Sequence, residues 1–272
     1  YSEKYDLPIL AGGWYYVLGR DEELLMDNLR IGAQLGSLVH NTQIIMDHAD
    51  GTLVTNDQVA EIYIKAYELG ESVGCLPTFE VHVNMWSEDF RRIEIVAEQV
   101  NRRGVPFRMT LDHSHVIFKI DNPIEQEVFS IGESIDSGDL VLDPIKNNHI
   151  CGKWINKGFV GHCHARTTVP NNPKNIWQHH SGLEELVSQH PKNTVGRGIQ
   201  YPFIRPKKGQ WHSDWQESKL EPWKEVIRQL MMYHQNNNES SLRTISTEFI
   251  PFPDYGGGAK YSIFENIDFR TL

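Results

Sequence analysis

Short apolar runs alternate with longer amphipathic stretches along this chain, which is the pattern of repeated β/α units. The apolar runs are bounded by turn-forming residues and are typical of buried strands. The predicted strands cover residues 9–18, 38–45, 78–84, 107–111, 140–142, 159–164 and 244–250. The pattern therefore predicts an α/β fold in which strands and helices follow one another.

The amphipathic stretches carry recognisable helix ends. Asn56 can cap a helix that Gly74 stops, and Ser87, followed by acidic residues, can open another that ends near Gly104. Apolar residues recur at spacings of three and four between these ends, at Val59, Ile62, Ala66, Leu69 and Val73 in the first helix and at Phe90, Ile93, Ala97 and Val100 in the second. Further helices are expected near residues 21–35 and 222–234, so several apolar stripes face a sheet.

One region, residues 167–215, interrupts this alternation. It is rich in Pro, Asn, His, Gly and Trp and has little periodicity. A loop this long within a compact domain is usually functional, and its aromatic residues favour burial. We interpret residues 1–272 as a single domain in which 167–215 is an inserted lid or partner-binding loop.

The composition of the chain argues against several classes of function. Among 272 residues, 26 Lys and Arg face 36 Asp and Glu, which gives a net charge of 26 − 36 = −10 without a basic tract. Nucleic acids and anionic membranes need concentrated positive charge, so neither is an expected partner. No apolar run reaches the roughly 20 residues of a membrane span, and three widely spaced cysteines indicate neither a disulfide framework nor structural zinc. We expect a cytoplasmic protein.

Polar clusters stand at the ends of several predicted strands. The side chains of Glu80, His82 and Asn84 alternate with apolar residues, which predicts that they share one strand face. The other clusters are Asp112-His113-Ser114-His115, His162-Cys163-His164-Ala165-Arg166, the isolated Glu248, and His40-Asn41-Thr42-Gln43. A carboxylate within an apolar strand is costly unless it is paired or bound to metal.

In a β/α barrel, functional side chains converge from the carboxyl ends of several strands. A metal site in that position would take its ligands from acids and histidines at several strand ends, and four predicted strand ends of this sequence carry such residues. Carboxylates with one imidazole favour a divalent ion, most of all Mn²⁺, with Mg²⁺, Co²⁺ or Zn²⁺ as alternatives.

Glu80, the Asp112-x-x-His115 pattern, the Gly161-His162-Cys163-His164 run and Glu248 resemble the metal site of the xylose-isomerase-like TIM barrels, which include the ketose 3-epimerases. The resemblance implies a (β/α)8 TIM barrel with a long insertion before its last strand. It implies metal ligation by Glu80, Asp112, His164 and Glu248, with His115 near the sugar. The strand end His40-Asn41-Thr42-Gln43 could then bind sugar hydroxyls. Seven candidate strands, and a first ligand close to the start, predict that the N-terminal βα portion is lacking from this chain.

The spacing departs from that family. The steps from Asp112 to His164 (164 − 112 = 52) and from His164 to Glu248 (248 − 164 = 84) are longer than in the epimerases. His212 could therefore replace His164 as the imidazole ligand or add a catalytic base. The insertions also make the chain similar to the large subunits of bacterial C-glycoside deglycosidases, which are Mn-dependent, require a small partner subunit and act on 3-oxo-glycosides.

The resemblance implies a sugar isomerase or epimerase that removes a proton next to a metal-bound carbonyl, with Glu80 and Glu248 as acid and base. Further candidates are His82 and His212 for catalysis and His113, His115, His162 and Arg166 for substrate binding. The first alternative is a C-glycoside deglycosidase or lyase that uses the same enolate chemistry. A non-catalytic sugar-binding barrel is the second. A small partner subunit or a homo-oligomer is expected beside the sugar or glycoside.

Overall fold

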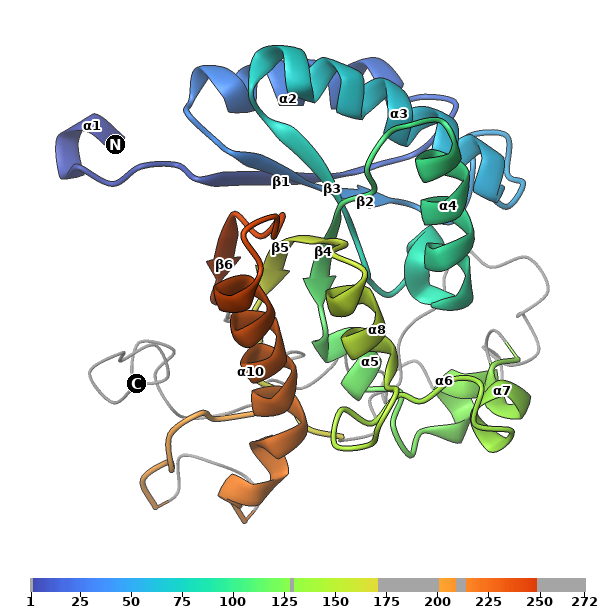
Figure 1. Ribbon diagram of the computed structural model, residues 1–272, viewed down its shortest axis with the longest axis vertical. Coiled ribbons are helices and arrows are strands. Elements are labelled where there is room, and N and C mark those ends of the chain that lie inside the picture. Colours follow the sequence, from blue (N-terminus) through green and yellow to red (C-terminus); the bar gives the residue numbers. More distant parts are fainter. Residues whose placement is uncertain (1, 128–129, 171–200, 209–213, 249–272) are drawn as a thin grey trace.

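A parallel sheet of six strands organises the computed structural model, which describes residues 2–127, 130–170, 201–208 and 214–248. The strands follow one another across the sheet in chain order (Figure 1). They are β1 (Ala11–Tyr16), β2 (Val39–Ile44), β3 (Leu76–Glu80), β4 (Met109–Asp112), β5 (Val160–His164) and β6 (Thr244–Ser246). All neighbouring pairs are parallel, so the carboxyl ends of the strands lie at one edge of the sheet.

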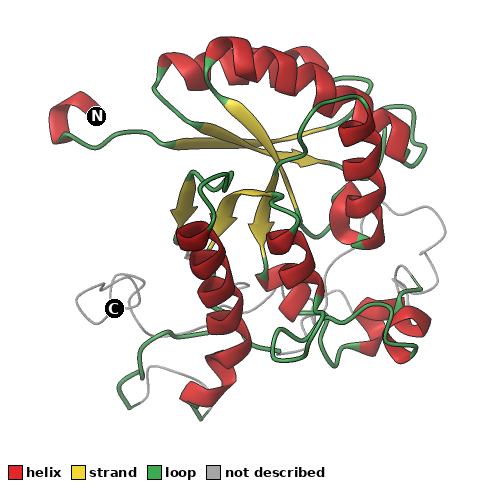
Figure 2. Ribbon diagram, in the orientation of Figure 1, coloured by secondary structure: helices red, strands yellow, loops and turns green. Residues whose placement is uncertain are grey.

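Helices cover the outer face of this curved sheet, as Figure 2 shows. The principal ones are α2 (Glu22–Gln34), α3 (Asn56–Val73), α4 (Arg91–Arg102), α8 (Ile150–Asn156) and α10 (Glu221–Asn236). Shorter helical segments are α1 (Ser2–Tyr5), η1 (Trp86–Glu88), α5 (Ser114–Ile117), α6 (Pro123–Glu127), α7 (Gly132–Asp136) and η3 (Glu217–Leu220). The expected alternation of strands and helices is thus confirmed.

The prediction of a closed (β/α)8 TIM barrel is wrong. Within the described residues β1 and β6 are the two edges of the sheet and do not pair with each other, so the six strands form an open half-barrel. A barrel closes only when the tilt and stagger of its strands bring the first strand beside the last. Six twisted strands in this order leave that gap open.

The predicted strand at residues 140–142 is also wrong. Strand β4 pairs directly with β5, which leaves no place between them. The Leu140 amide donates to the carbonyl of Ser134, and the Val141 carbonyl accepts from the amide of Ile150. Leu140 and Leu142 are buried, so their apolar character reflects packing and not membership of the sheet.

Helix ends agree with the sequence in one case and differ in another. Gly74 ends α3 with φ at 90°, in the left-handed region, although the cap at the start is Thr55, one residue before the expected Asn56. Ser87 opens no helix, because its hydroxyl donates to the backbone carbonyl of Glu80. It lies in the short η1 turn, and α4 begins at Arg91.

Two chemically different layers line the two faces of the sheet. Phe79, Leu111 and Cys163 face the helices and are buried among their apolar side chains. The opposite face carries Thr78 and Thr110, whose hydroxyls lie 2.7 Å apart. Polar side chains therefore occupy the concave face at the level just below the strand ends.

The expected insertion at 167–215 lies largely outside the described residues, but its described flanks meet. The Tyr201 amide donates to the carbonyl of Thr167 at 2.9 Å, and Val169, Tyr201 and Leu220 form a small buried cluster. Its role as a lid or partner-binding loop stays a prediction. None of the helices in the described part of the chain has the length and apolarity that crossing a bilayer requires.

Close packing of α3 on the start of β3 yields a stability prediction. A Cβ added at Gly70 would lie 2.6 Å from the backbone oxygen of Cys75, which cannot move as a flexible side chain could. We expect Gly70→Ala to lower the free energy of unfolding by about 1–2 kcal/mol, because overpacking outweighs the better helix propensity of alanine.

Urea denaturation followed by circular dichroism would measure this change. Gly132→Ala is the matched control, because no heavy atom lies within 4 Å of the added Cβ there. A Gly70→Ala protein as stable as the Gly132→Ala protein would contradict the close approach.

Candidate metal centre

Four predicted ligands from neighbouring strands converge at the carboxyl edge of the sheet. Glu80 ends β3, Asp112 ends β4, His164 ends β5, and Glu248 follows β6 by two residues. One ligand atom from each lies within 4.8 Å of the others. Residues separated by up to 168 positions (248 − 80) are thus brought together by the parallel register.

Both carboxylate oxygens of Glu80 are held by polar partners. Its Oε2 accepts hydrogen bonds from Asn41 Nδ2 at 2.7 Å and from Gln43 Nε2 at 2.5 Å, and both donors belong to β2. Its Oε1 lies 3.0 Å from His164 Nδ1. Burial alone would raise the pKa of Glu80, but the attraction of His164 outweighs burial and lowers that pKa to about 2.

His164 links two of the acids. Its Nδ1 lies 3.0 Å from Glu80 Oε1 and 3.1 Å from Glu248 Oε2. Burial opposes its positive charge, yet the two carboxylates raise the pKa of His164 well above its ordinary value. The imidazole proton therefore lies between the acids, at the position where a cation would neutralise both.

Asp112 is balanced by a different cation. Its Oδ1 accepts from the amide and hydroxyl of Ser114, while its Oδ2 lies 3.3 Å from a guanidinium nitrogen of the fully buried Arg166. Burial would raise the pKa of Asp112, but the charge of Arg166 holds it well below the usual range. Asp112 is therefore an ionised carboxylate in the interior.

Two buried oxygens of the cluster bear on metal binding. Asp112 Oδ2 and Glu248 Oε2 make no hydrogen bond within the described residues, although both are shielded from solvent and each has an ion-pair contact. Buried polar atoms are normally satisfied, and a divalent cation coordinated by carboxylates and one imidazole would satisfy these. The four side chains thus fit a divalent metal such as Mn²⁺.

Three of the other predicted site residues, His115, His82 and Arg166, border the cluster. His115 Nε2 lies 3.2 Å from Asp112 Oδ2 and 3.0 Å from Arg166 Nη2. The ring of His82 lies over that of His115, with 4.1 Å between their centroids. The expectation that Glu80, His82 and Asn84 share a strand face fails because β3 ends at Glu80, and Asn84 has a positive φ of 63° in the following turn.

The remaining candidates lie in other surroundings. His113 is buried against Trp223 of α10, on the helix-facing side of β4, and neither of its ring nitrogens makes a hydrogen bond within the described residues. His162 is buried one level below His164 and lies 2.6 Å from the hydroxyl of Thr244. His212 lies outside the described residues.

Sequence reasoning missed the residues that hold the cluster in place. Asn41 and Gln43 were expected to bind sugar, but their amides are directed at Glu80. Ser114 donates to Asp112 and accepts from Arg166, so it joins acid and cation. The alternation of Asn41 and Gln43 on β2 was the available signal, because two polar residues on one strand face need a partner there.

A titration with Mn²⁺ tests the cluster directly. We expect one Mn²⁺ to bind per chain and about one proton to be released, because a ligating imidazole must be neutral whereas His164 is protonated between its acids. Isothermal titration calorimetry in two buffers with different ionisation enthalpies measures both quantities.

The variant Asp112→Asn should weaken Mn²⁺ binding by at least about tenfold, a loss that even an outer-shell change can produce. The control is Asp136→Asn, at an exposed carboxylate of α7. Equal affinities of the two variants would contradict ligation by Asp112.

Comparisons of the sequence with protein-family models and with curated proteins find no match. The family resemblance noted in the sequence therefore stays a prediction. What the structure contributes is a cluster of three carboxylates and one imidazole that could hold a divalent metal.

Proposed function

We propose that this protein is a divalent-metal-dependent sugar isomerase or epimerase that moves a proton at the carbon next to a carbonyl. The observation that supports this proposal most is the convergence of Glu80, Asp112, His164 and Glu248 at the carboxyl edge of the sheet. These residues would hold the metal. A divalent cation supplies Lewis acidity, which polarises a carbonyl and acidifies the neighbouring C–H bond.

Glu248 is the better candidate for proton transfer. Both oxygens of Glu80 are engaged, and donated hydrogen bonds make a carboxylate a weaker base. The carboxylate of Glu248 is 26% exposed, and its Oε2 makes no hydrogen bond within the described residues. We assign removal of the substrate proton to Glu248, and Glu80 would face it across the cluster as the second carboxylate.

His115 is suited to orient a sugar hydroxyl. A guanidinium can only donate, so Arg166 Nη2 donates to His115 Nε2 at 3.0 Å. The ring hydrogen then resides on Nδ1, from which it can be donated to an oxygen of the substrate. Burial lowers the pKa of His115 to about 4, which keeps the ring neutral in this role.

A second candidate function shares the proton-abstraction step. From a 3-oxo-glycoside, loss of the C2 proton gives an enolate that can expel a group from C1, which is a deglycosidase or lyase reaction. The observation that favours it is a stacked pair of aromatic rings, Trp14 and Tyr15, with centroids 4.8 Å apart and each about half exposed. Tyr15 is in register with Gln43, the partner of Glu80, so a flat leaving group could stack near the cluster.

Solvent exchange in heavy water distinguishes these functions. We expect the Mn²⁺-loaded protein to incorporate deuterium next to the carbonyl of at least one sugar in a panel of ketoses and 3-oxo-glycosides, as followed by NMR. Exchange without loss of a substituent supports epimerisation, and release of a phenol supports elimination. Sugar binding without exchange or product would overturn the enzyme proposal in favour of a sugar-binding protein.

Replacing the proposed base tests the mechanism. Glu248→Gln should reduce exchange by about 10²–10⁴-fold, the usual contribution of general acid–base catalysis, while the thermal unfolding midpoint stays unchanged. Glu133→Gln, at an exposed carboxylate of α7, is the control. If Glu248→Gln exchanges as fast as the control, Glu248 is not the base.

A further inference from the structure

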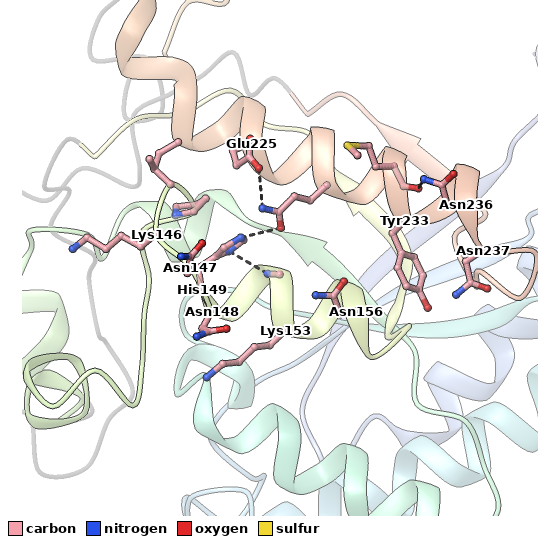
Figure 3. A pocket seen from close by; sticks show the side chains of 15 residues that line it. Lys146, Asn147, Asn148, His149, Lys153, Asn156, Glu225, Tyr233, Asn236 and Asn237 are labelled. Carbon is pink, nitrogen blue, oxygen red and sulfur yellow. Dashed lines mark hydrogen bonds between the residues drawn. The ribbon is translucent and has the colours of Figure 1, made fainter.

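A groove between α8 and α10 lies apart from the candidate metal centre. Its volume is about 860 Å³, within the range of ligand sites, and none of the four clustered residues lines it. Figure 3 shows α10 along one side of the groove, with α8 and the turn before it along the other. The groove is therefore a separate feature of the outer helical layer.

A connected set of hydrogen bonds fixes one wall of the groove. The Gly152 amide donates to His149 Nδ1 at 3.1 Å, so the ring hydrogen is on Nε2, which donates to Gln229 Oε1 at 2.9 Å. Gln229 Nε2 in turn donates to Glu225 Oε1 at 2.8 Å, as the dashed lines in Figure 3 show. His149 is only 3% exposed, while Gln229 and Glu225 are half-buried, so this wall is built from polar groups with defined donor and acceptor roles.

Glycine at position 152 keeps this wall in place. A Cβ there would lie 2.9 Å from His149 Nε2 and 3.0 Å from Gln229 Oε1. Any side chain would therefore push apart the two groups that join α8 to α10. The groove depends on a residue without a side chain at this position.

Carboxamides dominate the open part of the groove. Asn147, Asn148 and Asn156 are exposed, and none of them makes a side-chain hydrogen bond within the described residues. Tyr233 lies between Asn156 and Asn237 in Figure 3 and presents a half-buried ring. An amide offers a donor and an acceptor side by side, which matches a pair of neighbouring hydroxyls, and an aromatic ring can cover the face of a sugar.

Other ligand classes fit the lining less well. Peptides are usually held by a free strand edge, an apolar groove or an aromatic cleft, and this groove lies between two helices with an amide-rich lining. Phosphorylated or acidic ligands are typically met by arginine clusters, whereas no arginine lines this groove and its two lysines, Lys146 and Lys153, share the lining with the carboxylate of Glu225. Of the ligand classes considered, the lining therefore favours a neutral ligand with many hydroxyls.

We propose that the groove between α8 and α10 binds neutral carbohydrate, as a site separate from the candidate metal centre. Paired amides would hold vicinal hydroxyls, and Tyr233 would contact the apolar face of one sugar unit. The proposal does not depend on the metal centre or on any catalytic activity.

Saturation-transfer NMR and calorimetry with the full chain test this site. The carbohydrate probes are maltotetraose, cellotetraose and xylotetraose. Tetra-alanine represents peptide ligands, and inorganic pyrophosphate represents phosphorylated or acidic ligands. We expect at least one tetrasaccharide to bind saturably, in the presence of EDTA and equally to Glu248→Gln. No saturable binding of any tetrasaccharide, or binding of tetra-alanine or pyrophosphate alone, would overturn the proposal.

A double variant, Asn147→Ala with Asn156→Ala, locates the binding. Both residues are exposed, so folding should be unaffected, and affinity for the tetrasaccharide should fall at least tenfold. The control is Asn238→Ala. Asn238 is exposed and follows the lining residue Asn237 in sequence, but it does not line the groove itself. Unchanged affinity of the double variant, or an equal loss in the control, would place the sugar elsewhere and contradict the proposal.

Discussion

The candidate metal centre depends on one constraint, the crowding of three carboxylates at the edge where parallel strands end. Two unit charges 4 Å apart near a protein surface repel by about 4 kcal/mol. Three acids within such a distance are tolerable only where neighbouring groups compensate them. Much of the surrounding structure is understandable as this compensation, which β2, β5 and the segment after β5 supply.

Each carboxylate is compensated by different means, and the differences separate the chemical roles. Glu80 receives two neutral amide donors from β2, which hold it in one orientation, and the charge of His164 keeps it ionised. Asp112 is opposed by a buried guanidinium, so its charge is neutralised before any metal binds. Glu248 has only the ion pair with His164 among the described contacts. The least compensated acid is thus Glu248, to which the proposed function assigns proton transfer.

The sequence identified the ends of β4 and β5 well, at Asp112 and His164, since an apolar run that stops at an acid or histidine marks the place where a buried strand reaches polar surroundings. It failed where the outcome depends on partners distant in the chain. Closure of a sheet depends on whether its two edge strands meet, which no local pattern records. Leu140 and Leu142 look like a strand because packing beneath helices selects apolar residues as a sheet does. Asn84 does not share a strand face with Glu80 because the alternation of side chains holds only while the strand continues, and β3 ends at Glu80.

An open sheet is nonetheless sufficient for this cluster. The four residues come from β3, β4, β5 and the segment after β6, which are consecutive neighbours, so their convergence needs the local twist and not a closed barrel. The positions of these residues in the sheet differ in the number of neighbouring strands. Glu80 and Asp112 end strands with partners on both sides, whereas Glu248 follows a three-residue strand that is paired only with β5 in the described sheet. Fewer neighbouring strands constrain this segment than constrain β3 and β4, so Glu248 is the one of the three proposed carboxylate ligands whose position best suits a second role in proton transfer.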